Sequence, residues 1–510
     1  MSLSDLNLVL LGTAGVLLLG VAAVRVASWM GLPSLLLYLA MGLLMGESGL
    51  GLTFSDAHLT QVLGTVALAV ILAEGGLTTR WQTVRPVLGL SLTLATLGVG
   101  ISVVVTSSLV FLLLDVDLRT AVLLGCVISS TDAAATFAVM RTLPVGRRLR
   151  STLEAESGFN DPPVIILVTV VTSDAWDSAS AFHIGGQMLY QLVGGLVAGI
   201  AVARTGQALL SRMALPSAGL YPLATLAICF AAFAAAGLVG ASGLLAIYVA
   251  GLWLGNATLP HRQATLAFNE GLAWFAQIGL FVLLGLLASP SRLVDAIVPA
   301  LIVGSALTFV ARPVSVLVCA SWFRVPLRQQ AFLSWAGLRG AVPIVLATIP
   351  VSVGLASADR VFDVVFLLVV TFTLVQGPTL GWAARQMGLV ESTQTREIEV
   401  DSAPLEAMAA TVLQVDVTPG SRLAGVSVTE LMLPPGAVVT LVLRDGSLFV
   451  PTPASVFAVG DRLMIAAPSA VQRPVERRLR AVARAGRLAG WRGENGEDSP
   501  RTTRRAGSLP

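Results

Sequence analysis

The sequence predicts an all-α polytopic membrane protein with about 13 transmembrane helices in two inverted repeats with interrupted helices, followed by a small α+β cytoplasmic C-terminal domain. Composition is the first reason, because 55% of the 510 residues are hydrophobic and 12% are charged, against about 25% charged residues in soluble domains. About thirteen apolar runs of near-spanning length are the second reason. The third is a change of composition after about residue 390.

The apolar runs are separated by short polar breaks. They lie near 6–28, 33–52, 58–78, 86–114, 118–141, 155–174, 184–211, 218–238, 240–257, 266–288, 293–322, 329–349 and 357–386. Alternate loops differ in charge. The basic ones carry Arg80, Arg85, Arg141, Arg147, Arg148, Arg150, Arg204, Arg212, Arg262, Arg324, Arg328 and Arg385. The others are acidic or nearly neutral, with Glu47, Asp56, Asp115, Asp117, Asp174, Asp177 and Asp359. Because basic loops collect in the cytoplasm, we expect an inner (plasma) membrane protein with its N-terminus outside, its C-terminus inside and an odd number of spans.

Two of the predicted spans are interrupted by residues that loosen a helix. The fifth contains Ser129-Ser130-Thr131-Asp132, and the twelfth contains Gly337-Leu338-Arg339-Gly340-Ala341-Val342-Pro343. They are seven spans apart, as expected if spans one to six and eight to thirteen are inverted repeats around span seven. Interrupted helices at matching positions of two repeats are the best sequence indication of a transporter's binding site.

The third unusual segment, residues 154–163, opens the sixth span and carries three carboxylates and an Asn where hydrocarbon is expected. Each ionised group at mid-membrane depth costs at least about 2.5–3.5 kcal/mol. Ser157 and Asp161 share one helical face and Glu156 and Asn160 the neighbouring one. The prolines that follow lack N–H groups, so nearby carbonyls lose their helical partners. The segment is therefore predicted to bind a proton or a small cation in turn.

The predicted cation and proton ligands are hard oxygens, which suit an alkali cation and no other metal. They come from Thr131, Asp132, Ser157 and Asp161, with Glu74 as a further buried acid that completes or steers the site. An intramembrane acid is functional by default, although a lone one can also serve packing, and for Glu74 both interpretations stay open.

Other polar residues of the spans are given structural or electrostatic roles. Arg339 is expected to pair with Glu156, Asn160 to support the site, and Arg25 and Arg312 to snorkel or pair structurally. No cofactor and no nucleic-acid partner are predicted, because the basic residues are scattered over short loops and a tail.

The residues after 390 are divided into a linker (391–402), a regulatory domain (403–470) and a basic, disordered tail (471–510). Short β-patterned runs at 412–417, 438–443, 448–450 and 462–465 are separated by turn signals such as Asp445-Gly446 and Gly460-Asp461. These runs predict the α+β domain.

The motifs Thr131-Asp132, Glu156-Ser157-x-x-Asn160-Asp161 and Gly337-Leu338-Arg339-Gly340 resemble those of the monovalent cation:proton antiporter superfamily, in its NhaP-type branch. The segment 403–470 is similar to the C-terminal module of RCK/TrkA-type proteins, a combination most like the NhaP2-type potassium:proton antiporters. The resemblance implies a homodimer that exchanges a cation for H⁺ by competition at Asp161, with K⁺ favoured and Na⁺ open, and a small regulatory ligand at the C-terminal domain.

Electroneutral exchange is also implied by the resemblance. Asn160 stands where the electrogenic branch has a second Asp, and that branch uses a Lys, whereas all 32 basic residues here are Arg. Two alternatives stay open. An RCK-regulated cation channel fits the C-terminal domain, but no Thr-Val-Gly-Tyr-Gly filter occurs. An intramembrane protease using Asp132 and Asp161 lacks a Gly-x-Gly-Asp motif.

Overall fold

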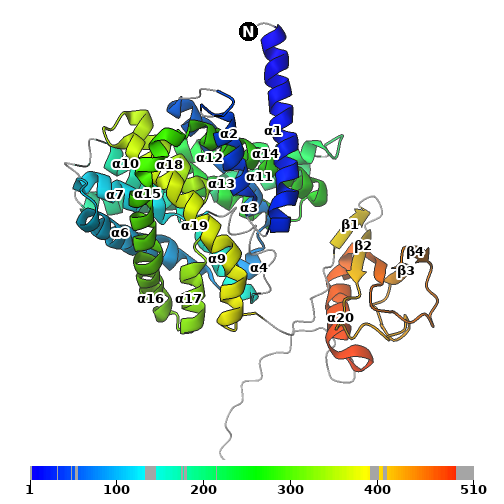
Figure 1. Ribbon diagram of the computed structural model, residues 1–510. Coiled ribbons are helices and arrows are strands. Elements are labelled where there is room, and N and C mark those ends of the chain that lie inside the picture. The colour runs from blue at the N-terminus through cyan, green and yellow to red at the C-terminus, as the bar shows by residue number, and fades with distance from the viewer. Residues whose placement is uncertain are drawn as a thin grey trace, which may run out of the picture. The chain divides into compact units, whose positions relative to one another are not determined.

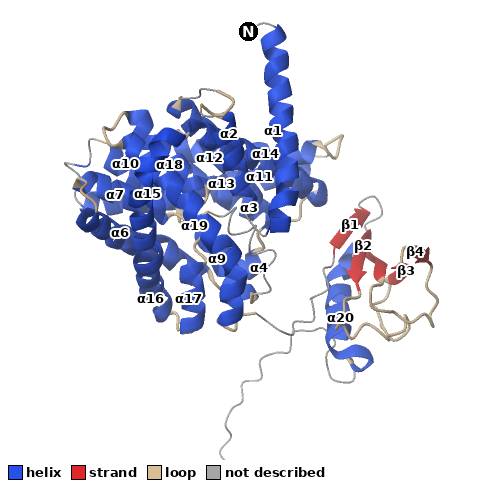
Figure 2. Ribbon diagram, viewed as in Figure 1, coloured by secondary structure: helices blue, strands red, loops and turns tan. Residues whose placement is uncertain are grey.

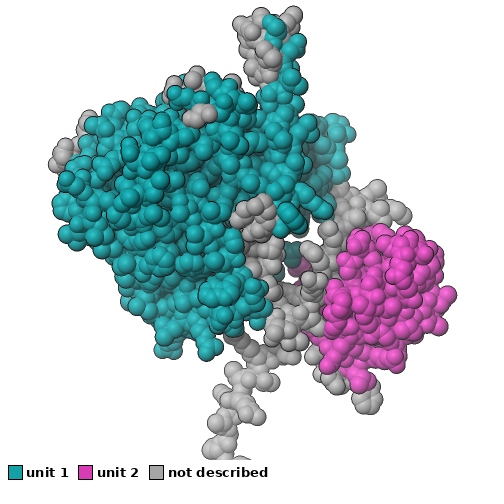
Figure 3. All heavy atoms as spheres, in the orientation of Figure 1, with its two compact units in different colours: residues 1–390 teal, residues 391–510 magenta. Residues whose placement is uncertain are grey.

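The structure is a computed structural model that describes residues 3–30, 33–47, 49–51, 56–132, 145–173, 176, 181–213, 215–390, 401–405 and 410–489. The chain divides into two compact units, residues 1–390 and 391–510 (Figure 3). Among the described residues, the first unit is built of helices and the second contains the strands (Figure 2).

The helices of the first unit follow the predicted apolar runs (Figure 1). They are α1 (Leu3–Met30), α2 (Ser34–Met45), α3 (Ala57–Thr78), α4 (Trp81–Val84), α5 (Leu88–Thr93), η1 (Leu94–Gly98), α6 (Val99–Leu113), α7 (Leu118–Ser129), α9 (Arg147–Phe159), α10 (Asp161–Thr172), α11 (Ala181–Arg212), α12 (Leu220–Leu238), α13 (Gly243–Asn256), α14 (Arg262–Leu287), α15 (Pro290–Ser305), η3 (Ala306–Ala311), α16 (Arg312–Trp322), α17 (Leu327–Trp335), α18 (Ala341–Val353) and α19 (Ala358–Gln386).

Eight helical stretches in the described part of the chain are long and apolar enough to cross a membrane. They are Leu10–Ala27, Ala57–Thr78, Leu88–Leu113, Gly185–Arg212, Leu220–Leu238, Arg262–Leu287, Pro290–Trp322 and Ala358–Gln386. Shorter apolar helices include the predicted short span, which is α13, and one half of each interrupted span, α7 and α18. The polytopic helical fold is confirmed, and the total of 13 spans stays a prediction. Asp174, Asp177, Arg141 and the second half of the predicted run 118–141 lie outside the described residues.

Two long spans share one irregularity. A π-helical segment, η1, joins α5 to α6, and another, η3, joins α15 to α16. Each π-helical segment packs against the other span, η1 against α16 and η3 against α6. Each of these spans also precedes one of the interrupted ones. The repeat of this order agrees with the predicted internal symmetry, and π-helical turns are frequent at functional sites.

Close helix packing elsewhere depends on small residues. A Cβ atom at Gly76 of α3 would lie 2.5 Å from the Tyr248 carbonyl oxygen, and one at Gly251 of α13 would lie 2.7 Å from that of Ala73. Only Gly fits at these positions, which is the usual way in which membrane helices approach each other. The backbones of α3 and α13 are therefore in contact.

The second unit is a five-stranded antiparallel sheet in the order β1-β2-β5-β3-β4. Its strands are β1 (Asp401–Leu405), β2 (Ala410–Asp416), β3 (Val438–Arg444), β4 (Ser447–Phe449) and β5 (Arg462–Pro468). Asp445 and Gly446, both with positive φ, form the predicted turn between β3 and β4, as a two-residue hairpin requires. The α+β domain is thereby confirmed.

The predicted C-terminal boundary of the regulatory domain, at residue 470, was wrong. A short η5 (Ser469–Val471) leads into α20 (Gln472–Ala485), and η6 (Gly486–Leu488) follows. Val475, Leu479 and Val482 of α20 are fully buried in the core of the sheet unit. The folded unit therefore includes residues that we expected in the disordered tail. The N-terminal edge also differs, because β1 begins inside the predicted linker.

An ion pair between the half-exposed Arg444 and the buried Asp461 predicts acid sensitivity of this unit. Arg444 donates to both carboxylate oxygens of Asp461 at 2.7 Å, and the Ala458 amide donates at 2.8 Å. Burial alone would raise the pKa of Asp461, but these hydrogen bonds outweigh burial and hold that pKa below its usual value. Such a carboxylate stabilises the fold above the unfolded-state pKa of about 3.9 and loses this contribution as pH falls through the folded-state pKa.

The protection of the β3 and β5 amides against hydrogen exchange, relative to the unfolded chain at the same pH, should therefore decrease as the pH falls below about 4. Asp461→Asn should lower this protection already at neutral pH and flatten its pH dependence. Asp445→Asn at the exposed turn is the control and should change neither. An unchanged exchange profile in Asp461→Asn would contradict the role of this pair.

Candidate functional site

The two interrupted spans cross at their non-helical segments. Helix α7 ends at Ser129 and the chain continues without helical structure through Asp132, while α17 ends at Trp335 and α18 begins at Ala341. The Asp132 amide donates to the Leu338 carbonyl oxygen at 3.0 Å. The backbone of one interruption is thus hydrogen-bonded to the backbone of the other.

Each interruption also places a charged side chain on the end of the opposite half-helix. Asp132 Oδ2 accepts a hydrogen bond of 2.8 Å from the Ala341 amide at the start of α18. The Arg339 guanidinium donates to the carbonyl oxygens of Ser129, at 2.8 Å, and of Ser130, at the end of α7. An anion at a helix N-terminus and a cation at a helix C-terminus are both stabilising. Both side chains are at most 3% exposed.

Gly340 makes this arrangement possible. A Cβ atom there would collide with the Asp132 carboxylate. We predict that Gly340→Ala lowers stability by on the order of 1–3 kcal/mol, the usual cost of overpacking, because the carboxylate must leave the α18 amide. Thermal unfolding of the purified protein measures this. Gly100→Ala, where nothing lies within 4 Å of the added atom, is the control. Equal effects of the two changes would contradict the prediction.

The sixth predicted span is broken at Asn160. Helix α9 ends at Phe159, and α10 begins at Asp161 with Pro162 and Pro163 in its first turn. Proline is favoured at this position, because the first N–H groups of a helix have no intrahelical acceptor. The carbonyl groups of Gly158 and Phe159 accordingly have no helical donor four residues later. Helix α9 begins at Arg147, well before the predicted start of the run.

The break at Asn160 and the interruption after α7 meet in one polar cluster. Thr131 Oγ1 lies 3.0 Å from Ser157 Oγ, and Asn160 Nδ2 donates to Thr131 Oγ1 at 2.5 Å. Asp132 lies within electrostatic reach of Asp161. All five side chains are at most 3% exposed. The structure thus brings together residues that the sequence could relate only by motif.

Three oxygens in or next to this cluster are buried without a hydrogen-bond partner in the described part of the chain: Ser130 Oγ, Asn160 Oδ1 and Asp161 Oδ1. A buried polar atom normally has a partner, and leaving one without costs about 1–3 kcal/mol, more for a charged group. Two of these atoms can only accept, and the third is a hydroxyl oxygen with free lone pairs. The arrangement suits a proton on the carboxylate or a cation held by oxygens.

We had expected Glu156 to pair with Arg339, and the structure shows a different partner. Arg312, the first residue of α16 after η3, donates to both carboxylate oxygens of Glu156, at 2.5 and 3.0 Å. Both side chains are at most 5% exposed. Such a two-bond pair matches the fork of a guanidinium. The prediction failed because two intramembrane arginines could serve as the counter-ion, and Arg339 was needed elsewhere, at the end of α7.

Two residues of the site were missed from sequence. Ser130 was noted only as a helix breaker, and Tyr248 of α13 was not noted. The Tyr248 ring packs edge-on against Phe159, with ring centroids 5.5 Å apart, and covers Gly158. A hydroxyl next to Thr131 in an interrupted helix was the available signal for Ser130. Glu74 lies half-buried on α3, and its place in the site stays a prediction.

Comparison with known proteins agrees with these features. Residues 15–386 match the family described as sodium/hydrogen exchanger, transmembrane, and residues 412–480 match the TrkA-C domain. The chain is 34% identical over 468 residues, 90% of its length and 81% of the relative, to a protein named K(+)/H(+) antiporter NhaP from Alkalimonas amylolytica. Identity is also 34% to K(+)/H(+) antiporter NhaP2 from Shewanella baltica, with 86% and 77% of the two chains covered. A solved structure of the sodium proton antiporter MjNhaP1 from Methanocaldococcus jannaschii superimposes with a TM-score of 0.66 at 22% identity, over 76% of this chain and all of that one.

Proposed function

The chain belongs to the sodium/hydrogen exchanger family and is a cation:proton antiporter, and we propose that it exchanges K⁺ for H⁺ by competition at the carboxylate of Asp161. The observation that carries the proposal is that Oδ1 of this buried carboxylate has no hydrogen-bond partner among the described residues, and the same holds for Oδ1 of Asn160, the preceding residue. An ionised carboxylate in such surroundings needs a positive partner. A proton and an alkali cation are the two candidates.

The neighbouring charges support a stoichiometry of one to one. Glu156 is neutralised by Arg312, and the charges of Asp132 and Arg339 are each held at a half-helix end. Asp161 is then the carboxylate of the cluster whose charge still needs compensation. Because one negative charge takes either one proton or one monovalent cation, the bound site carries the same net charge in both cases. Exchange is therefore proposed to be electroneutral.

The choice of K⁺ over Na⁺ is supported by the relatives with 34% identity, whose names state K⁺/H⁺ antiport. The ligands proposed here are Thr131, Ser157, Asp132 and Asp161, with Asn160 beside them. All are hard oxygens, and selectivity among alkali cations depends on cavity size and coordination geometry rather than on ligand type.

The experiment reconstitutes the purified protein in liposomes that contain a pH-sensitive dye. An outward K⁺ gradient should acidify the lumen, Na⁺ should act more weakly, and clamping the membrane potential at zero should leave the rate unchanged. Equal rates with both ions would refute the K⁺ preference. A rate that follows the imposed potential would refute electroneutrality, and large K⁺ currents without proton movement would favour a channel instead.

We also propose a homodimer in the plasma membrane, with the N-terminus outside and the C-terminal unit in the cytoplasm, where that unit binds a small regulatory ligand. The exposed apolar surface of helix α1 is consistent with contact to a second copy of the chain or to lipid. Only 11% of its apolar window Leu10–Ala27 is buried within the chain, and Leu11 and Leu18 are each 72% exposed. Such a surface needs an apolar neighbour.

A further inference from the structure

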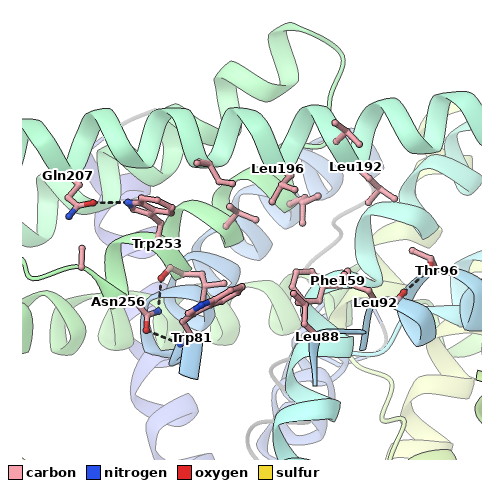
Figure 4. Close-up of a pocket in the computed structure, with 16 residues that line it drawn as sticks. Trp81, Leu88, Leu92, Thr96, Phe159, Leu192, Leu196, Gln207, Trp253 and Asn256 are labelled. Atoms are coloured by element: carbon pink, nitrogen blue, oxygen red, sulfur yellow. Dashed lines mark hydrogen bonds between the residues drawn. The ribbon is translucent and has the colours of Figure 1, made fainter. Parts of the chain in front are cut away.

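We propose that the first unit binds one anionic phospholipid, whose acyl chain occupies an apolar cavity of about 770 Å³ and whose phosphate lies beside the guanidinium groups of Arg80 and Arg262. The cavity lies against Phe159, one residue before the break at Asn160 (Figure 4). Cavities of about 300–1,000 Å³ are of the size that holds small ligands. The proposal does not depend on cation exchange.

The walls of the cavity are mainly aliphatic, with three aromatic residues, Trp81, Phe159 and Trp253. Leu88 and Leu92 of α5, Leu192 and Leu196 of α11, and Val249 of α13 line it. Its polar side chains have hydrogen-bond partners. Trp253 Nε1 donates to Gln207 Oε1 at 2.7 Å (Figure 4), and Thr96 and Asn256 are bonded to backbone groups. What remains is hydrocarbon surface on membrane-spanning helices, which suits an acyl chain.

One end of the cavity is tied to two arginines. Asn256, which lines this end, accepts a hydrogen bond of 2.8 Å from the Trp81 amide and donates to the Thr79 carbonyl oxygen at 2.9 Å. Arg80 is the residue between them. Arg262 donates to the carbonyl oxygen of Gly255, the neighbour of Asn256, at 3.2 Å.

These two guanidinium groups are close enough to repel each other, and both residues are exposed. Among the described residues, neither forms a salt bridge. Two exposed arginines of like charge, next to residues that line one end of an apolar cavity, fit a phosphate attached to an acyl chain. The loop charges predict this end to be cytoplasmic, where the leaflet of the bilayer is anionic and attracts basic residues.

The acyl chain is tested by filling the cavity. Leu196→Trp places an indole in the cavity. Val197→Trp is the matched control, because Val197, the next residue on α11, is 59% exposed and does not line the cavity. Native mass spectrometry of the full chain, titrated with phosphatidylglycerol, counts bound lipid. We expect at least a fivefold weaker affinity for the first lipid in Leu196→Trp and none in Val197→Trp. Equal affinities in the two variants would overturn the proposal.

The headgroup is tested with a double variant, Arg80→Gln with Arg262→Gln. The native chain should prefer phosphatidylglycerol to phosphatidylcholine, and the double variant should lose this preference. Arg385→Gln, an exposed arginine at the end of α19, is the matched control and should keep it. Equal binding of both lipids by the native chain would overturn the anionic assignment.

If Leu196→Trp fails to fold, a measurement on the native chain tests whether an anionic lipid occupies the cavity. Phospholipids with brominated acyl chains quench nearby tryptophans, and Trp81 and Trp253 line the cavity. Brominated phosphatidylglycerol should quench more than brominated phosphatidylcholine at the same fraction of the bilayer, and Trp253→Phe should reduce the excess. Equal quenching by the two lipids would argue against a specific site.

Discussion

Asp161→Asn should abolish cation-dependent proton movement, to the level of liposomes without protein, while the protein still folds. The amide has the size of the carboxylate but cannot take up a proton or compensate a cation. Folding should survive because the substitution removes a buried charge whose oxygen lacks a partner in the described chain, and an uncompensated buried charge is itself destabilising. Dye-loaded proteoliposomes measure exchange, and gel filtration and thermal unfolding measure integrity.

The matched control is Asp295→Asn, an exposed carboxylate on α15, which should keep the native rate. Normal exchange in Asp161→Asn would remove the basis of the proposed mechanism. A loss of both exchange and folding would instead assign Asp161 a structural role.

Arg312→Met should destabilise the helical unit by on the order of 3–5 kcal/mol, because it leaves the Glu156 carboxylate buried without its counter-ion. Glu156 is 1% exposed, and each of its carboxylate oxygens accepts a hydrogen bond from Arg312, at 2.5 and 3.0 Å. Adding Glu156→Gln should restore most of the loss, since the remaining amide carries no charge. The test is a double-mutant cycle, in which thermal unfolding in detergent is measured for the native chain, the two single variants and the double variant.

Arg360→Met serves as the control, because this arginine of α19 is exposed. Its unfolding temperature should match that of the native chain. If Arg312→Met unfolds at the same temperature as Arg360→Met, the ion pair contributes nothing to the fold. If the double variant is no more stable than Arg312→Met alone, the two residues do not act as a pair.

The membrane fold was accessible from sequence because apolar length and loop charge act locally. The motifs around Thr131, Ser157 and Asn160 also indicated the cluster, since polar groups in hydrocarbon must find partners inside the protein. What the sequence could not fix was the choice among partners. Glu156 needed a cation, but Arg312 and Arg339 are both intramembrane arginines, and the choice depends on where the second interruption crosses the first.

The helix α20 shows a different limit. Its arginines and the following glycines were interpreted as a solvated tail, although Val475, Leu479 and Val482 repeat at the spacing of a helical face. The pattern was present, and the charge between those residues obscured it. In the structure Arg473, Arg477 and Arg484 are exposed and Arg478 is buried, donating to the Leu431 carbonyl oxygen at 3.0 Å, while the three apolar side chains close the core of the sheet unit.

The exchanged contacts of Asp132 and Arg339 have a consequence for descent and for protein engineering. Because each of these side chains is hydrogen-bonded to the backbone at an end of the other's helix, each broken span needs a charged side chain from the other. A chimera that imports residues 118–132 from a distant homologue should assemble when that homologue carries an acid in the place of Asp132, and should fail when it does not. The two segments are separate in the gene, but each carries the charge that the other requires.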